Sequence, residues 1–301
     1  MERANIVKDS NTISPRVALI GFGEAGSTFA RAGEWAGHAK GWDLLAERRT
    51  AMAECQVEAG TDAAAALAEA ELALSLVTAD EALKAAQDYA PLLPEGALFC
   101  DMNSVAPGTK QAAAEAVEAA GGHYVDVAVM APVDKALGVP LLIAGERAAE
   151  AEAMLHALGF TNTRVVGPEI GQASAIKLCR SVMVKGLEAL TAEMVLAASK
   201  AGVLDEVLAS LDASEKPVSW PTRADYNLDR MLIHGQRRSA EMAEAARMLR
   251  DLGIDPLMTD NTVSRQQALG ALGISPPPDG LAAKLTAIND RTGSGGEESK
   301  A

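Results

Sequence analysis

The chain has 301 residues, of which 49% belong to the hydrophobic set, and its formal net charge is −14. This length predicts about two domains with a core of ordinary size. The acidic balance argues against a nucleic-acid partner, because binding phosphates requires a basic surface. No apolar run reaches the roughly 18 residues that span a bilayer, and no apolar signal core precedes residue 16. We therefore expect a cytoplasmic protein with no membrane partner.

Cysteines and histidines are few. The three cysteines are odd in number and far apart, which indicates reduced thiols and not a disulfide framework. The four histidines show no ligand spacing, so no metal site is predicted.

After an expected flexible leader (residues 1–15), the first expected strand, Val17–Ile20, runs into a glycine-rich turn of the pattern G-x-G-x-x-G. In this pattern Gly21 permits a tight turn, Gly23 leaves room for a pyrophosphate, and Gly26 lets the following helix pack on the strand. The helix N-terminus then offers its N–H groups to the phosphates. The turn predicts a dinucleotide site formed by Gly21, Phe22, Gly23, Glu24, Ala25 and Gly26.

An acidic residue is expected about 20 positions after the turn, at the end of the second strand, where it would hold the adenosine ribose. Glu47 follows the second expected strand, Asp43–Ala46, and favours NAD as the cofactor. Arg48 and Arg49 come next and could instead hold the 2′-phosphate of NADP, which stays as the alternative.

From residue 16 to 168, apolar runs alternate with Ala-rich helical patterns, which predicts an α/β Rossmann-type domain with a parallel, doubly wound sheet. Its ligand is expected at the carboxyl ends of the strands. The later strands are expected at Leu72–Val77, Leu98–Met102, His123–Val129, Leu141–Ala144 and Thr163–Val166, and helices at Gly26–Ala39, Asp80–Ala90 and Thr109–Ala120.

From residue 169 to 290, strand patterns nearly vanish, which predicts an all-α C-terminal domain. A long helix over 172–201 is apolar on most sides, and such a helix is buried between domains or subunits, so we expect a homodimer. Further helices are expected at 203–212, 221–234, 238–252 and 256–272, and residues 291–301 as a disordered tail.

Lys177 lies early on the long helix, between Ile176 and Leu178, and Ser181 shares its face one turn later. Desolvation in an apolar setting lowers the pKa of a lysine, as a general acid/base near neutral pH requires. Taken alone, the pattern better fits a helical lysine whose ammonium reaches solvent.

Four motifs in order resemble the β-hydroxyacid dehydrogenase family of the 6-phosphogluconate dehydrogenase-like superfamily: Gly21–Gly26, Asp101–Pro107, Asp126–Val129 and Gly167–Lys177. The resemblance covers the first 200 residues. It implies a nucleotide domain joined by a long interdomain helix to a helical C-terminal domain. It also implies that Lys177 is the catalytic acid/base in hydride transfer between a nicotinamide and a carbinol carbon.

Polar residues after two of the expected strands are further candidates. Asn103 and Ser104 are expected to face the nicotinamide ribose and the substrate, or only to form a turn before Pro107. Thr78 is expected either to contact the cofactor or to cap the next helix.

The chain departs from the family in its second motif, which normally reads D-A-P-V-S-G-G. Met130 in the matching stretch offers no hydroxyl, and Pro132 has no N–H group. The resemblance therefore implies an altered substrate site at Met130 and a hydroxy acid larger or differently shaped than 3-hydroxyisobutyrate. Ser181 stands where the family has an asparagine, and it can still bond a substrate oxygen.

Residues 234–244 resemble the C-terminal domain of an uncharacterised branch of the same superfamily. Arg237 and Arg238 follow an expected helix break at Gly235 and are expected to bind a substrate carboxylate or phosphate. The alternative is that Arg237 pairs with Glu241 along a helix surface.

Together these motifs predict an NAD(P)-dependent dehydrogenase acting on a hydroxy acid as its small-molecule substrate, in which Ser104 and Ser181 orient the substrate. Imine reduction on the same scaffold is one alternative. A non-catalytic NAD(P)-binding sensor is another, because Met130 and Pro132 fit a lost substrate site.

Overall fold

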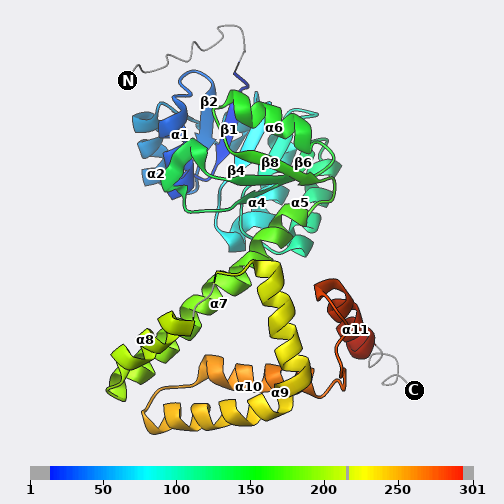
Figure 1. The fold of residues 1–301 in the computed structure, drawn as a ribbon. Helices are drawn as coiled ribbons and strands as arrows, with labels where there is room; N and C mark the ends of the chain where they lie inside the picture. The colour runs from blue at the N-terminus through cyan, green and yellow to red at the C-terminus, as the bar shows by residue number, and fades with distance from the viewer. Residues whose placement is uncertain (1–13, 215–216, 294–301) are drawn as a thin grey trace, which may run out of the picture. The chain divides into compact units, whose positions relative to one another are not determined.

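The computed structural model describes residues 14–214 and 217–293 (Figure 1). The chain forms two compact units, residues 1–182 and 183–301. The division falls within the long helix α7 (Gln172–Lys200), so the first three turns of this helix belong to the first unit.

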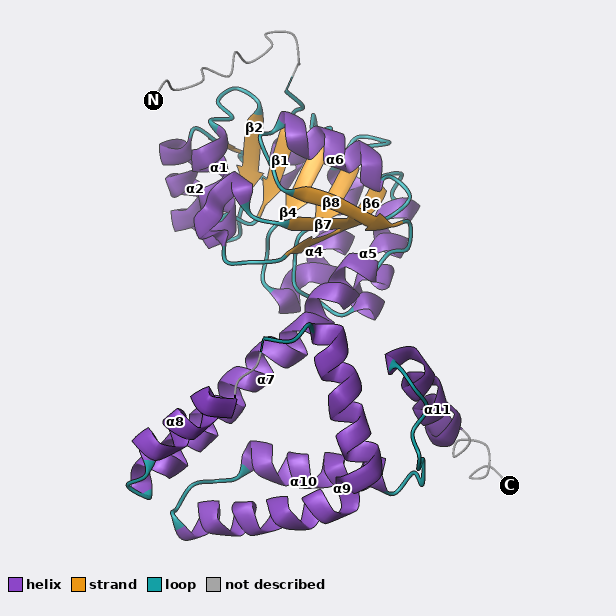
Figure 2. Ribbon diagram, in the orientation of Figure 1, coloured by secondary structure: helices purple, strands orange, loops and turns teal. Residues whose placement is uncertain are grey.

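The first unit is built on one eight-stranded sheet with the strand order β3-β2-β1-β4-β5-β6-β7-β8 (Figure 2). All neighbouring strands are parallel except β6 and β7. The strands are β1 (Val17–Ile20), β2 (Ala39–Trp42), β3 (Glu58–Ala59), β4 (Leu72–Ser75), β5 (Leu98–Asp101), β6 (His123–Val129), β7 (Leu141–Ala144) and β8 (Thr163–Gly167).

Helices cover both faces of this sheet, because its strands are apolar on both sides. Successive residues of a strand point to opposite faces: Val17 and Leu19 join one buried cluster, and Ala18 and Ile20 join another. The helices of this unit are α1 (Glu24–Gly33), α2 (Ala46–Met52), α3 (Ala63–Leu67), α4 (Ala82–Tyr89), α5 (Pro107–Ala119) and α6 (Ala148–Ala157).

The predicted α/β fold is confirmed, with corrections in the sheet, one of which is the unexpected short strand β3. The second strand is Ala39–Trp42 and not Asp43–Ala46, because Asp43 turns to accept backbone N–H groups and Ala46 begins α2. The sheet is not wholly parallel, since β7 runs antiparallel to β6. Residues 130–140 between them are too few for the crossover helix that a parallel pair needs.

The described part of the second unit is helical, as predicted, but two helices differ from expectation. The expected break between residues 234 and 238 is wrong, because α9 runs unbroken through Gly235. An unexpected helix, α11, ends at Gly293, so residues 291–293 are helical and not part of a tail. The helices are α8 (Leu204–Ser214), α9 (Trp220–Asp251), α10 (Leu257–Gly270) and α11 (Leu281–Gly293).

Two buried charged groups hold this unit together. Lys284 of α11 donates a hydrogen bond to Asp225 Oδ1 at 2.7 Å and lies 3.2 Å from Asp229 Oδ1, both on α9. Glu193 of α7 accepts the backbone N–H groups of Met258 and Thr259 in the first turn of α10. A carboxylate there satisfies N–H groups that lack helical partners.

The expected leader (residues 1–13) and the end of the expected tail (294–301) lie outside the described residues. Within the described residues, none of the helices combines the length and apolar character needed to cross a membrane.

Gly235 permits a close approach between α9 and α10. A Cβ atom there would lie 2.3 Å from the carbonyl oxygen of Gln266 and 2.8 Å from Gly270 Cα. We expect Gly235→Ala to lower the free energy of unfolding by about 1–3 kcal/mol, since overpacking forces the two helices apart. Urea denaturation measures the change.

Gly108→Ala on α5 is the matched control, because a Cβ atom at Gly108 meets nothing within 4 Å. Its stability should equal or slightly exceed that of the wild type. Equal stability of both variants would contradict the described packing of α9 on α10.

Candidate functional site

A pocket of about 570 Å³ lies at the carboxyl ends of β1, β2 and β4. This is the edge at which parallel α/β sheets bind their ligands. Its walls come from the glycine turn, from the segment after β2 and from the segment after β4. They include Gly21, Gly23, Glu24, Asp43, Arg48, Thr78 and Lys84.

The glycine turn has the geometry that its sequence predicts. Gly21 has φ +91°, and a Cβ atom there would lie 2.8 Å from the carbonyl oxygen of Leu76. A Cβ atom on Gly26 would lie 2.8 Å from the carbonyl oxygen of Gly21, so α1 packs directly on the turn. Gly23 precedes the first residue of α1, and a Cβ atom there would meet nothing within 4 Å. The first N–H groups of α1 therefore face a side that is open to an anion.

The remaining residues of the turn have different surroundings. Phe22 is fully buried in the core, and Ala25 packs against the same core. Glu24 is exposed on the pocket wall. Phe22 and Ala25 thus shape the turn through packing, whereas its backbone and Glu24 face the pocket.

Asp43 is the acidic residue that directly follows β2. Its Oδ2 accepts the backbone N–H of Phe22 at 2.7 Å, and its Oδ1 accepts that of Leu45 at 2.8 Å. These bonds fix the carboxylate beside the glycine turn, where a ribose-binding acid belongs. Sequence reasoning missed Asp43 because it placed the second strand four residues too late. The signal that could have identified Asp43 is its spacing in the sequence, because it follows the glycine turn at about the distance expected of the ribose-binding acid.

Glu47 therefore lies on α2 and not at the end of a strand, and its predicted place is wrong. Glu47 is exposed and is not among the residues that line the pocket. Arg48 does line it, from α2, and Lys84 lines it from α4. Arg49 is engaged elsewhere, since it donates to the carbonyl oxygens of Asp43 and Leu44.

Thr78 lies on the pocket wall after β4. A hydrogen bond from its side chain is the main cause that lowers the pKa of the exposed Asp80 carboxyl below its ordinary value. Thr78 precedes a short 3-10 helix without capping it through its side chain. The side chain of Thr78 thus does not cap the helix, and its contact with the cofactor stays a prediction.

A buried polar cluster lies where α5 packs on β5 and β6. The Lys110 ammonium, with no exposed surface, lies 3.1 Å from Asp101 Oδ1 and 3.4 Å from Asp126 Oδ1. It also donates to the carbonyl oxygen of Asp101 at 2.6 Å. The members of the buried polar cluster are Ser75, Asp101, Asn103, Lys110, Tyr124, Asp126 and Ser174.

Asn103 lies two residues beyond Asp101, the last residue of β5. Its side-chain amide donates to Asp101 Oδ1 at 2.7 Å and to Ser75 Oγ at 3.0 Å. Its Oδ1 is buried and has no donor among the described residues. An unsatisfied buried carbonyl costs about 1–3 kcal/mol, so this oxygen is suited to accept a hydroxyl group from a ligand.

Burial keeps two groups in this region protonated, the Tyr124 hydroxyl of the buried polar cluster and the Cys100 thiol of β5. Burial, and then the neighbouring Asp101 carboxylate, raise the pKa of Tyr124 well above its ordinary value. Its hydroxyl therefore stays a donor to Asp101 Oδ2, at 2.7 Å. Burial likewise raises the pKa of the Cys100 thiol to about 12, so this cysteine is a core residue and not a nucleophile.

The candidate substrate residues of the first unit follow β5 and β6 or lie on α7. Ser104 is exposed after β5, and Met130, directly after β6, packs against a small cluster that includes Ala173 of α7. Lys177 and Ser181 are both partly buried on α7. The unit that holds the dinucleotide pocket thus also contains Ser104, Met130, Lys177 and Ser181.

Arg237 and Arg238 belong to the second unit, within the unbroken α9. Arg237 is exposed and Arg238 is partly buried. The Arg238 Nε atom is buried and has no acceptor among the described residues.

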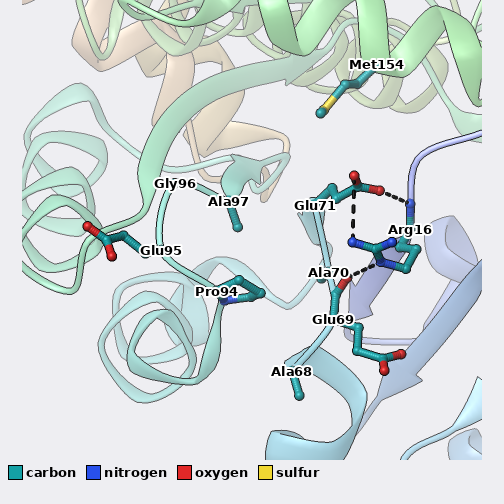
Figure 3. Close-up of a pocket in the computed structure, with 10 residues that line it drawn as sticks. All are labelled: Arg16, Ala68, Glu69, Ala70, Glu71, Pro94, Glu95, Gly96, Ala97 and Met154. Carbon is teal, nitrogen blue, oxygen red and sulfur yellow. Dashed lines mark hydrogen bonds and ion pairs between the residues drawn. The ribbon is translucent and has the colours of Figure 1, made fainter.

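A second hollow, of about 640 Å³, lies at the opposite edge of the sheet, before β1, β4 and β5. Figure 3 shows Arg16 there, bonded to the Glu71 carboxylate and to the carbonyl oxygen of Glu69. Arg16 and Glu71 already bond to each other, and Arg16 also bonds to the backbone. The hollow also lies at the amino ends of the strands, whereas such sheets bind ligands at the carboxyl ends, so it is a poor ligand site. Across residues 14–214 and 217–293, no three His, Cys, Asp or Glu side chains gather to hold a metal ion.

Two family models match the chain. Residues 16–167 match the NAD binding domain of 6-phosphogluconate dehydrogenase. Residues 198–269 match a domain of unknown function, DUF1932. The first match contains the glycine turn, Asp43 and most of the buried polar cluster.

Solved structures resemble the chain over most of its length. A conserved hypothetical protein from Sinorhizobium meliloti 1021 is 36% identical, with a TM-score of 0.59, over 93% of this chain and 97% of that one. The conserved protein MTH1747, of unknown function and structurally similar to 3-hydroxyacid dehydrogenases, is 28% identical, with a TM-score of 0.57, over 90% and 99%.

An imine reductase from Myxococcus stipitatus has the same fold at lower identity. Its variant in complex with NAD+ is 18% identical, with a TM-score of 0.71, over 92% of this chain and 99% of that one. Its complex with NADP+ is 19% identical, with a TM-score of 0.70, over 91% and 99%.

The residues at the carboxyl edge fit a nicotinamide dinucleotide. The open side of Gly23 admits a pyrophosphate, Asp43 suits the adenosine ribose, and Asn103 Oδ1 lacks a donor. Asp43 repels the 2′-phosphate of NADP, whereas Arg48 and Lys84 on the pocket wall attract it. Because a hydrogen bond from Phe22 fixes the Asp43 carboxylate beside the glycine turn, we expect NAD to bind more tightly than NADP.

We expect Asp43→Asn to raise the Kd for NADH about tenfold, since a charged acceptor for the ribose hydroxyls becomes neutral. The Kd for NADPH should stay the same or fall, because the amide does not repel a 2′-phosphate. Fluorescence titration measures both constants.

Glu47→Gln makes the same change of charge outside the pocket wall and should leave both constants within about twofold. The reverse pattern, weaker NADH binding only in Glu47→Gln, would make Glu47 the ribose acceptor.

Proposed function

The chain belongs to the family that has the NAD binding domain of 6-phosphogluconate dehydrogenase, and from this premise we propose that it is an NAD-dependent dehydrogenase acting on a hydroxy acid. The observation that carries the proposal is the place of Lys177, in the same compact unit as the dinucleotide pocket. It lies one turn beyond Ser174, whose bonds to Asp126 join α7 to the sheet.

The proposed chemistry divides between cofactor and protein. A bound nicotinamide supplies the hydride acceptor or donor at its C4 carbon. Oxidation of a carbinol also releases the hydroxyl proton, which Lys177 Nζ accepts, and reduction returns that proton from the same nitrogen. Asn103 Oδ1 would accept a hydrogen bond from a hydroxyl group of the nicotinamide ribose. Ser104 and Ser181 would orient the substrate oxygens.

The substrate site differs from that of short 3-hydroxy acids. Met130 and Pro132 follow β6 and offer neither a hydroxyl nor a backbone N–H to a carboxylate. We assign the binding of the substrate's anionic group to Arg237 and Arg238, because a guanidinium binds carboxylate or phosphate with two parallel bonds. The proposed substrate is then a hydroxy acid that is larger or differently shaped than 3-hydroxyisobutyrate.

Imine reduction is the second candidate, favoured by the fold shared with the Myxococcus stipitatus imine reductase. Lys177 favours alcohol chemistry, since a carbinol needs a group to take its proton. A panel containing both hydroxy acids and cyclic imines separates the two. Bound NADH with no turnover of any member would favour the non-catalytic sensor.

We also propose a homodimer, in which a second copy covers apolar side chains that this chain leaves exposed. On α7, Val182 is 78% exposed and Leu196 is 56% exposed, and on α8 Leu211 is 52% exposed. Apolar surface that continues along helices marks an interaction site. Sedimentation equilibrium should give a dimer mass at micromolar concentration, and a stable monomer would contradict the proposal.

We expect Lys177→Ala to lower the rate of hydride transfer about 10²- to 10⁴-fold, the usual loss when a general acid/base is removed. The Kd for NADH should change less than about twofold, because Lys177 acts on the substrate hydroxyl. Stopped-flow absorbance of the nicotinamide measures the rate on any member of the panel that is turned over.

Lys200→Ala, at the far end of the same helix, is the control and should keep the wild-type rate. Its ammonium bonds the carbonyl oxygens of Leu252 and Gly253 in the second unit. Wild-type turnover in Lys177→Ala would remove the lysine from the mechanism.

A further inference from the structure

Asp126 lies in β6 with no exposed surface, and its carboxylate reaches the first turn of α7. Its Oδ2 accepts the backbone N–H of Ser174 at 3.0 Å, and its Oδ1 accepts the Ser174 hydroxyl at 2.7 Å. A carboxylate in this place satisfies an N–H group that has no helical partner and interacts favourably with the helix dipole. Asp126 thus caps α7 from a strand that is distant in sequence.

The residue directly before α7 cannot cap the helix itself. Gly171 has φ +97°, and a Cβ atom there would lie 2.8 Å from Pro107 Cβ at the start of α5. The positive φ and the close contact with Pro107 both require glycine at this position. Glycine has no side chain that could accept a hydrogen bond from a helix N–H group. The start of α7 is therefore packed against α5 through Gly171 and capped by Asp126.

Asp126 also connects α7 to the residue expected to meet the cofactor. Its Oδ1 lies 3.4 Å from Lys110 Nζ, which lies 3.1 Å from Asp101 Oδ1. Asp101 Oδ1 in turn accepts both the backbone N–H and the side-chain amide of Asn103. One buried polar cluster thus holds the end of β5 and the start of α7 in a fixed relation.

Lys177 lies three residues beyond Ser174, so the two share one face of the helix. A helix is stiff over one turn, and a shift of its first turn carries Lys177 with it. We propose that Asp126 is a positioning residue that sets the place of Lys177 relative to the bound nicotinamide. This inference rests on the proposed acid/base role of Lys177.

The test measures how strongly NADH protects the Lys177 amine from trace acylation by acetic anhydride, read by mass spectrometry. In the wild type, saturating NADH should slow acylation several-fold. In Asp126→Asn, this protection should fall by at least half, while the Kd for NADH changes less than about threefold. Amide hydrogens of residues 172–175 should exchange about fivefold to tenfold faster, because the cap is weakened. If Asp126 only stabilised the fold, its substitution would not reduce the protection of Lys177 while leaving the Kd for NADH nearly unchanged.

Asp62→Ala is the control, because Asp62 caps α3 by accepting the Ala65 N–H at 2.8 Å. It should keep the wild-type protection of Lys177 and the wild-type exchange of α7. Ser174→Ala is the milder variant, since it removes one hydroxyl and keeps every charge of the buried polar cluster. It should shift protection and exchange in the same direction as Asp126→Asn, and it decides the question if Asp126→Asn does not fold.

Wild-type protection in Asp126→Asn, with NADH bound, would overturn the inference and leave the role of Lys177 intact. Absence of protection in the wild type at saturating NADH would instead overturn the proposed role of Lys177, and the inference would fall with it.

Discussion

A lysine ammonium enclosed between two buried carboxylates is the interaction on which the candidate site depends. The parallel register of β5 and β6 places Asp101 beside Asp126 on the same face of the sheet, where two negative groups would repel each other. Lys110, from α5, lies within 3.4 Å of both. Removing one partner of a buried ion pair typically costs about 3–5 kcal/mol, because an uncompensated charge stays behind. The lysine therefore fixes both carboxylates where they are.

Each carboxylate then orders a different part of the site. Asp101 holds Asn103 and leaves the Asn103 Oδ1 atom without a donor. Asp126 holds Ser174 at the start of α7. The amide that we propose to meet the cofactor and the helix that bears the proposed acid/base are thus ordered by one buried cluster. Such an arrangement suits hydride transfer, whose rate depends on the relative placement of cofactor, substrate and proton acceptor.

Much of the fold could be predicted because its signals are local. The strands Val17–Ile20, His123–Val129 and Leu141–Ala144 have the predicted bounds, since each is a short and mostly apolar run next to turn residues. The break at Gly235 was wrong because a glycine that ends one helix looks the same in sequence as one that admits a neighbouring helix. α11 was missed because its helix depends on a distant partner, the Lys284 contact with α9.

The candidate site was predictable only where residues close in sequence form it. The glycine turn is contiguous, and its geometry agrees with the prediction. The ribose acid was misplaced because the strand before Asp43 contains a lysine and a glycine and has only four residues. The buried polar cluster was not predicted at all, since Lys110, Asp126 and Ser174 come from separate elements and each resembles an ordinary polar residue.

A crystal structure of the chain with NADH bound tests the proposed site most directly. In that structure the adenosine ribose should lie at Asp43 and the pyrophosphate against Gly23, and a hydroxyl of the nicotinamide ribose should lie within hydrogen-bond distance of Asn103 Oδ1. The nicotinamide C4 carbon should face the site of Lys177. NADH bound at another surface, or bound here with Asn103 Oδ1 still unpaired and Lys177 remote from the nicotinamide, would contradict the proposed site.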